Sequence, residues 1–190
     1  MNDQFHEEVV TQKRQGFQSV TLLLANLMMI IMAIIVFFGL QALMRVVSAM
    51  IGGQAAAPAI VLPLVMFLAG GGLAVLLFLK KDEIRTEYEY TITNASLDFA
   101  KVFNNKKRKA LGTMNLKNIE ACGKVSSGSF HRYITMPQIK RSNWFLNRDA
   151  DLFYLYYTKN GEKRIIIIEP SEELVEMIRR VVVPGVYQTN

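Results

Sequence analysis

The chain has 190 residues, of which 51% are hydrophobic, and its 22 Lys and Arg residues outnumber 16 Asp and Glu residues to give a net charge of +6. This length fits one or two units of ordinary domain size. The single cysteine, Cys122, excludes an internal disulfide and therefore a secreted domain held together by disulfides.

Two long uncharged runs occupy the first half of the chain. No charged residue occurs from Gln15 to Met44 or from Val46 to Leu79. A membrane-spanning helix needs about 20 apolar residues, so each run can hold one span. We therefore predict a transmembrane helical hairpin over residues 20–79, with spans at residues 20–42 and 59–79.

The segment between the two spans predicts an exposed turn. Ser48–Pro58 is rich in small residues and glycine and ends in a proline. Ala55–Ala57 resembles the cleavage site of a signal peptide. However, the preceding apolar run is longer than the usual span of about 7–15 residues, and a second apolar run follows. We therefore predict that the hairpin is not cleaved.

The distribution of basic residues predicts the sidedness of the hairpin. The connecting loop holds only Arg45, whereas five basic residues flank the spans on their other side: Lys13, Arg14, Lys80, Lys81 and Arg85. Lys and Arg are biased towards the cytoplasmic side of a membrane. We expect a cell-membrane protein with two spans and both termini in the cytoplasm, in which residues 1–19 form a cytoplasmic tail.

The spans hold few polar side chains. They have no ionisable residue of the kind that marks an ion or proton path, and Asn26 and Gln41 are their notable polar residues. Gly70 and Ala74 form a small-residue pair that lets helices approach closely. We expect this pair to pack against the first span, the alternative being the interface of a dimer.

The remainder, residues 80–190, is predicted to form one soluble domain that is mostly β. Alternating side chains predict strands at residues 87–93 and 96–103, followed by shorter strands within 108–125. Asn160-Gly161 lies between two apolar runs, which is the strongest local signal for a β-hairpin. Because both runs are apolar on successive residues, we expect each strand to be covered on both faces.

The end of the chain changes to a helical period. Pro170–Val181 has acidic residues in its first turn, Arg179 and Arg180 in its last turn, and an apolar stripe that includes Leu174 and Ile178. We expect this helix to end the fold and residues 186–190 to be frayed.

About seven short strands followed by one helix resemble a pleckstrin-homology-like (PH-like) domain. The resemblance is sharpest at YEYTITNASLDFAKVFNNKKRKALGTMNLKNIEA and YYTKNGEKRIIIIEPSEELVEMIRR. The whole chain is similar to small Gram-positive bacterial membrane proteins of uncharacterised function, with two N-terminal spans and a cytoplasmic bacterial PH-like domain. This resemblance implies an α+β fold, a transmembrane hairpin followed by a PH-like β-barrel or sandwich, but supplies no activity.

The densest basic run is the predicted turn Lys106, Lys107, Arg108 and Lys109. It suits contact with anionic lipid head groups or with an acidic partner, and the alternative is an ordinary solvated turn. Many PH domains bind phosphoinositides through basic residues in the loop after the first strand. The corresponding loop here, Asn94-Ala95, has none, which weakens the lipid interpretation.

Aromatic and basic residues alternate within residues 130–148, where Arg132, Lys140, Arg141 and Trp144 are candidate contacts to lipid or to a partner. The alternative is that the aromatic side chains pack into the domain. Nucleic acid is not expected as a partner of a chain anchored in a membrane.

No motif predicts catalysis, a cofactor or a metal site. Asn147, Asp149 and Asp151 imitate the start of a calcium loop, but Leu152 and Thr158 stand where glycine and glutamate are required. We therefore expect a non-enzymatic interaction module that docks a protein partner, or a further copy of itself, at the cytoplasmic membrane face. The alternative is a domain that binds anionic lipid or organises the membrane, and an enzyme without a recognisable motif is more remote.

Overall fold

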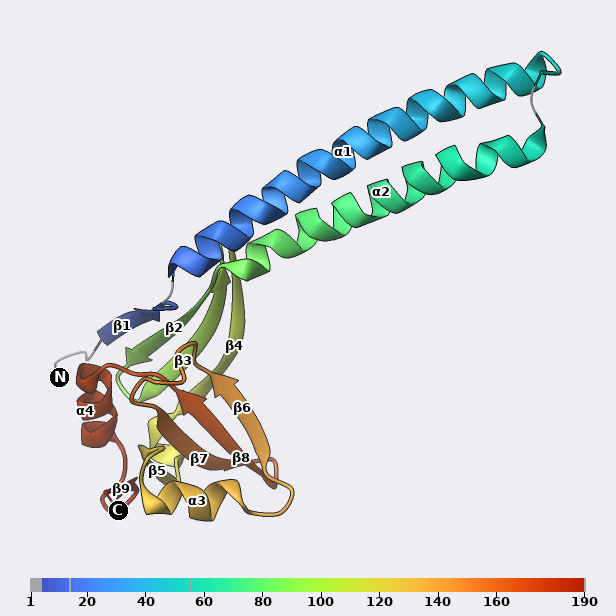
Figure 1. Ribbon diagram of the computed structural model, residues 1–190. Helices are drawn as coiled ribbons and strands as arrows, with labels where there is room; N and C mark the ends of the chain where they lie inside the picture. The colour runs from blue at the N-terminus through green and yellow to red at the C-terminus, as the bar shows by residue number, and fades with distance from the viewer. Residues whose placement is uncertain (1–4, 14, 55, 190) are drawn as a thin grey trace. The chain divides into compact units, whose positions relative to one another are not determined.

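The computed structural model describes residues 5–13, 15–54 and 56–189 of the chain (Figure 1). These residues form two compact units. The first, here called the β-domain, joins the residues up to Lys13 with those from Thr86 onwards. The second, the helical hairpin, comprises the residues between them. The hairpin is therefore an insertion into the β-domain.

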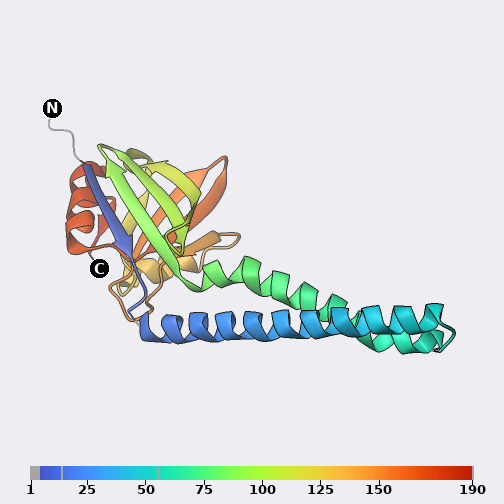
Figure 2. The same ribbon diagram turned by 90° about the horizontal axis from the view of Figure 1, so that it is seen from above.

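The helical hairpin consists of two long helices, α1 (Gln15–Ile51) and α2 (Val61–Lys80), which run side by side (Figure 2). Short 3₁₀ turns, η1 (Ala57–Ile60) and η2 (Lys81–Ile84), precede and follow α2. Both helices are long and apolar enough to cross a membrane. The connecting turn is shorter than predicted, because α1 continues through Ser48 to Ile51, and Arg45 lies within the helix and not in the loop.

Glycines set the contact between the two helices. A Cβ atom at Gly39 would lie 3.2 Å from the backbone nitrogen of Phe67, and one at Gly70 would lie 3.2 Å from a methyl carbon of Val36. The helices therefore touch at these two glycines, where a side chain would hold them apart. Ala74 is half-buried one turn beyond Gly70.

The first sheet of the β-domain has four antiparallel strands in the order β1-β2-β3-β4. They are β1 (Phe5–Val10), β2 (Thr86–Thr93), β3 (Ser96–Phe103) and β4 (Lys107–Asn115). Asn94 and Asn104 adopt positive φ in the tight turns between them, as the sequence predicted.

Strand β1 corrects the prediction of an N-terminal tail. It pairs with β2 along its full length, from Phe5 opposite Thr93 to Val10 opposite Tyr88. Val10 is buried in the core, and the Glu8 carboxylate accepts a hydrogen bond of 3.1 Å from the backbone N–H of Ser171. The segment is therefore structural, and the soluble domain does not begin at residue 80.

The second sheet has five strands in the order β6-β8-β7-β5-β9. They are β5 (Ala121–Lys124), β6 (Lys140–Trp144), β7 (Phe153–Lys159), β8 (Glu162–Ile168) and β9 (Tyr187–Gln188). The predicted turn at Asn160-Gly161 is confirmed, with φ of 54° and 77° at the two residues. Strand β9 corrects the prediction of a frayed C-terminus, because Tyr187 and Gln188 pair with β5.

Three helical segments complete the β-domain: η3 (Leu116–Asn118), α3 (Gly128–Ile134) and α4 (Glu172–Val181). The predicted C-terminal helix is confirmed as α4. Its Ser171 side chain caps it by accepting a hydrogen bond of 3.2 Å from the backbone N–H of Leu174.

The core explains why β7 and β8 are apolar on successive residues. One face contributes Leu155 and Ile166 to the main core, which also contains Leu174 and Ile178 of α4 and the inner face of the first sheet. The other face, with Tyr154, Tyr156, Ile165 and Ile167, packs beneath Phe130 and Tyr133 of α3. Both faces are covered, as predicted, and the fold is a sandwich and not a closed barrel.

Candidate functional site

Both connections to the helical hairpin leave the β-domain at one end of the first sheet. Val10, the last residue of β1, lies opposite Tyr88, and β2 begins nearby at Thr86. Thr86 lies opposite Phe103, which in turn lies opposite Lys107. The turn between β3 and β4 is therefore at the same end of the sheet as the two connections, although it is far from Val10 in the sequence.

The predicted basic run starts in this turn at Lys106 and continues along the first residues of β4, which corrects the prediction that all four basic residues lie in a turn. Lys106, Lys107, Arg108 and Lys109 are all exposed. The Arg108 guanidinium is 2.8 Å from the Glu89 carboxylate, and the salt bridges found among the described residues include no partner for the three lysines. We call Lys106–Lys109 the basic turn. Its positive charge is largely uncompensated.

A neighbouring lysine extends the basic turn onto the sheet. Lys101 lies opposite Lys109 and across from Tyr88. Its ammonium group is 5.0 Å from the ring centre of Phe103 and 5.8 Å from that of Tyr88, so the aromatic faces support the charge by cation–π contact.

A buried amide fixes the connection between β1 and α1. Asn147, only 6% exposed, donates hydrogen bonds from Nδ2 to the Thr11 carbonyl at 3.0 Å and to Glu169 Oε1 at 2.7 Å. Its Oδ1 accepts a bond of 2.9 Å from the backbone N–H of Lys13. The resemblance to a calcium loop at this position is thus explained by a structural role of Asn147.

Glu169 completes this network. Its Oε2 accepts hydrogen bonds from the backbone N–H groups of Asn147 at 2.9 Å and Leu146 at 3.2 Å. The backbone N–H of Glu169 donates to the Tyr90 hydroxyl at 3.3 Å, and that hydroxyl donates to the Trp144 carbonyl. The residues that lead into α1 are therefore held by the second sheet as well as by the first. We call Asn147 and Glu169 the latch.

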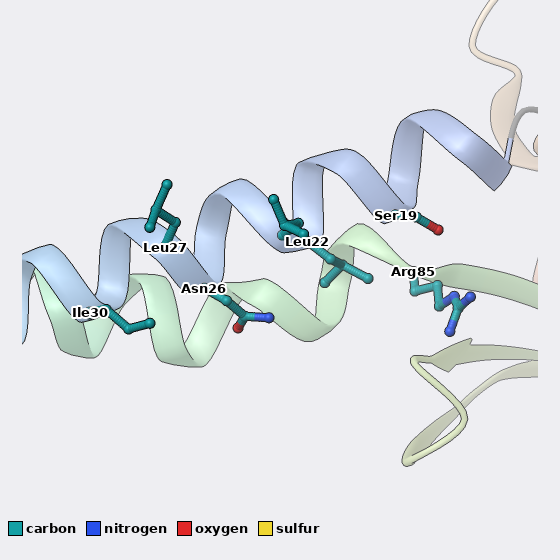
Figure 3. A pocket seen from close by; sticks show the side chains of 7 residues that line it. Ser19, Leu22, Asn26, Leu27, Ile30 and Arg85 are labelled. Carbon is teal, nitrogen blue, oxygen red and sulfur yellow. The ribbon is translucent and has the colours of Figure 1, made fainter.

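The helical hairpin carries a groove of about 500 Å³ beside the first half of α1 (Figure 3). Its lining has four apolar side chains, Leu22, Leu23, Leu27 and Ile30. The three polar residues of the lining are Ser19, Asn26 and Arg85. Figure 3 shows Ser19 and Arg85 at one end of the groove and Ile30 at the other. Arg85 is exposed, and the salt bridges found among the described residues do not include it.

The register of the helix pair places the polar side of this groove. Gly39 lies against Met66 and Phe67, and Gly70 lies against Ile35 and Val36. Because both helices rise by the same 1.5 Å or so per residue, this antiparallel register puts Asn26 level with Lys80. Ser19 and Arg85 then lie beyond Lys80, and Ile30 lies within the apolar part of the pair.

The other predicted contacts lie on the second sheet and on α3, separate from the basic turn. Arg132 is exposed on α3, and Lys140 on β6 forms an ion pair with Glu162. The Arg141 guanidinium donates to the Asn143 side chain at 2.7 Å. Lys140 and Arg164 hold the pKa of Glu162 below its usual value by hydrogen bonds and charge. Lys140 and Arg141 are therefore engaged locally.

Trp144 packs into the domain. Its ring centre is 4.8 Å from that of Phe99, and the side chain lies against the main core. Its indole carbon lies 3.8 Å from where a Cβ of Gly112 would be. This position favours the packing alternative over a membrane anchor.

Burial shifts the pKa of titratable groups of the core. Burial raises the pKa of the Cys122 thiol to about 12, so the reactive thiolate is disfavoured at neutral pH. Burial also raises the pKa of Tyr90. Within the described ranges, no group of three or more His, Cys, Asp or Glu side chains is placed to hold a metal ion.

The sequence alone did not point to the latch or to the groove. The latch joins Thr11 and Lys13 to residues more than a hundred positions away, and no local pattern marks such a contact. The groove had a signal, because Ser19, Leu22 or Leu23, Asn26 and Ile30 recur at the three- to four-residue spacing of one helix face.

Comparison with protein families agrees with this architecture. The family model of the bacterial PH-like domain (DUF6106) matches residues 2–188, which include both the β-domain and the helical hairpin. The chain belongs to this family. Comparisons with curated proteins and with solved structures found no match. A PH-like domain that carries two candidate membrane spans fits an interaction or lipid-binding module.

Proposed function

We propose that the chain is a non-enzymatic module, tethered to the cell membrane by two spans, whose PH-like domain contacts anionic head groups on the cytoplasmic face. The observation that carries this proposal is the position of the basic turn, at the end of the first sheet from which both hairpin connections leave. A second candidate function is the docking of a protein partner. It is favoured by a different surface, the edge of the second sheet at β5.

Strand pairing supports a common side for both ends of the hairpin. β1 and β2 are neighbours in one sheet, so a hairpin that enters a bilayer after Lys13 must return before Thr86 on the same side. Lys80, Lys81 and Arg85 at the return point favour the cytoplasm by the bias of positive charge. Both termini are then cytoplasmic.

The helix register supports a hydrocarbon span from Asn26 to Arg45 in α1, a few residues later than the sequence predicted. The helix between these two residues is about 28 Å long, which matches the roughly 30 Å thickness of a bilayer core. Asn26 and Lys80 mark one boundary of this span, and Arg45 marks the other.

Electrostatics favours contact between the basic turn and the lipid. Lys107 is two strands away from Thr86, which is about 10 Å at the usual strand spacing. The attraction of an anionic surface is worth about 1 kcal/mol for each nearby basic residue and extends over a Debye length of about 8 Å. The short connection keeps this end of the domain within that range.

The groove in the helical hairpin supports the same function. A phospholipid whose phosphate meets Arg85 would place its acyl chain against Leu27 and Ile30, below the level of Asn26. The Arg85 guanidinium suits a phosphate because it donates several hydrogen bonds in one plane.

The experiment uses the full chain in nanodiscs, with an environment-sensitive dye on Asn105→Cys next to the basic turn. Cys122 is fully buried, so the dye reacts at the exposed position 105. We expect a blue shift of the dye in nanodiscs with 30% anionic lipid relative to neutral nanodiscs. High salt should remove this shift.

Two variants make this experiment specific. Changing Lys106, Lys107, Arg108 and Lys109 together to serine should abolish the shift, whereas Lys140→Ser with Arg141→Ser, which removes two cations from β6, should preserve it. Equal dye spectra in neutral and anionic nanodiscs would contradict the lipid function and leave protein docking as the proposed function.

A further inference from the structure

Among the described residues, the edge of the second sheet at β5 is covered by the end of the chain itself, strand β9. Strand β9 has two residues, Tyr187 and Gln188, which pair in parallel with Cys122 and Gly123. The backbone N–H of Cys122 donates a hydrogen bond of 3.0 Å to the Val186 carbonyl. A short strand of this kind is the weakest part of a sheet, because few hydrogen bonds hold it against its own conformational entropy.

Gly123 lets this segment lie directly on the backbone of β5. A Cβ atom at Gly123 would lie 2.6 Å from the Gln188 carbonyl oxygen, closer than any side chain permits. The site therefore accepts an extended backbone and excludes a side chain on β5.

The segment has a hinge and one anchor. Pro184 and Gly185 precede it, and Gly185 adopts a φ of 88° that favours glycine. The anchor is the Tyr187 ring, whose centre is 6.1 Å from that of Phe153 and 5.3 Å from the Arg179 guanidinium carbon. Displacement of the segment needs the loss of this packing, of the short ladder and of the contact that Val186 makes with the main core.

A groove of about 230 Å³ continues from the segment, between α4 and the start of β7. Its apolar lining includes Leu152, Phe153 and Val175, which stay in place when the segment leaves, and Tyr187 of the segment itself. Its charged rim has three acidic residues and one lysine, namely Asp151, Glu172, Glu176 and Lys124, and Glu176 also pairs with Arg179 at 3.5 Å. The groove adjoins the next position of β5, Lys124, where a longer strand would continue beyond Gln188.

We propose that this edge docks an extended segment of a partner protein, in which apolar and basic residues alternate, and that the segment Tyr187–Gln188 is displaced when the partner binds. The partner backbone pairs with Cys122 and Gly123, its apolar side chain enters the groove against Val175, and its basic side chain meets Glu172 and Glu176. Strand addition of this kind takes its affinity from main-chain hydrogen bonds and its specificity from pockets beside the edge.

This inference specifies the second candidate function and rests on it, and it does not involve the basic turn. The chain's own segment shows that an extended strand fits the edge, and the acidic rim gives the charge of the partner. Because the segment competes for the edge, the apparent affinity for the partner equals the affinity of the open edge multiplied by the fraction of molecules in which the edge is open.

The test measures binding of two fluorescein-labelled hexapeptides to the full chain in neutral nanodiscs by fluorescence anisotropy. In one peptide tyrosine and valine alternate with lysine, and in the other the same residues alternate with glutamate. We expect the basic peptide to bind, and its affinity to rise about 10-fold when the chain is truncated after Val183 or when Tyr187→Ala weakens the anchor.

Three further variants locate the site. In the truncated chain, Gly123→Val should abolish binding, and Glu172→Gln with Glu176→Gln should weaken binding of the basic peptide about 10-fold. Changing Lys106–Lys109 to serine should leave peptide binding unchanged, so a failure of lipid contact and a failure of this inference are told apart. The Tyr187→Ala variant retains the whole chain, so the expectation does not depend on the truncated chain folding.

Three results of the binding assay would overturn the inference. The basic peptide could bind neither to the chain truncated after Val183 nor to the Tyr187→Ala variant, the two peptides could bind equally, or Gly123→Val could leave binding unaffected. A concentration-dependent dimer of the full chain that disappears on truncation would also overturn it, because the occupant would then be the segment of a second copy.

Discussion

The helical hairpin and the β-domain are organised in opposite ways along the chain. The helical hairpin is one continuous stretch whose two helices are joined by a short turn and touch at Gly39 and Gly70. The β-domain is interrupted, because β1 and β2 are neighbouring strands separated by the entire hairpin. The hairpin occupies the place where a tight turn would otherwise join two antiparallel strands.

In the proposed membrane topology, this difference links insertion to the folding of the PH-like domain. β1 could then pair with β2 only after both ends of the hairpin had come to the same side of the membrane. The latch then holds Thr11 and Lys13 by hydrogen bonds to Asn147. With this connectivity, the domain is complete only when both ends of the hairpin lie together.

The largest expected effect comes from removing β1. A chain of residues 80–190 should fail to unfold cooperatively, because it exposes the edge of β2 and loses Val10 from the core. Residues 1–13 joined to residues 86–190 by a short glycine-serine linker should fold as a soluble domain. Thermal unfolding followed by circular dichroism compares the two. Similar cooperative transitions in both would show that β1 is dispensable.

The latch should give the next largest effect. Asn147→Ala removes the partner of Thr11 and Lys13 and leaves Glu169 with fewer donors, which should lower the free energy of unfolding by about 1–3 kcal/mol. Urea unfolding of the linker-joined domain measures this loss. The exposed Asn118→Ala is the matched control, with an expected change within about 0.5 kcal/mol. Equal effects of the two substitutions would contradict the role of the latch.

A change inside the helical hairpin should act on that unit alone. Gly70→Val places methyl groups against Ile35 and Val36 and should destabilise the helix pair by about 1 kcal/mol or more. Gly71→Val is the control, because a Cβ atom there meets nothing within 4 Å. The rate of trypsin digestion or the thermal unfolding temperature in detergent should distinguish the two variants. The unfolding of the β-domain should not change. Two variants of equal stability would place the helix contact elsewhere.

The smallest effect is a pH dependence from Cys122. Burial raises its pKa from 9.0 to about 12, so the folded state favours the neutral thiol. The contribution is complete below pH 9 and is lost as the pH rises from about 9 to 12, because the unfolded chain ionises first. The stability difference between the linker-joined domain and its Cys122→Ala variant should therefore shrink between pH 8 and about pH 10. A constant difference would mean that the thiol ionises equally in both states.

Local patterns determined much of the fold. The hairpin helices, the turn at Asn160-Gly161 and the capped helix α4 each depend on residues close together in the sequence, where periodicity, turn residues and caps report the structure directly. The apolar runs of β7 and β8 also indicated correctly that both faces are covered.

Contacts between distant residues were decided by the tertiary structure. β1 contains two glutamates and has little alternation of its own, and it becomes a strand because β2, some eighty residues later, supplies its hydrogen-bond partners. The same is true of β9 on β5. Asn147 resembled a calcium ligand by its spacing, and only the folded chain shows that it binds the backbone before α1. The sequence by itself determined the two hairpin helices, the C-terminal helix α4, and the strands and turns of β2, β3, β7 and β8, but not α3. Only the tertiary structure brought the basic turn to the end of the sheet where the connections to the helical hairpin leave, because strand register is set by pairing across the whole fold.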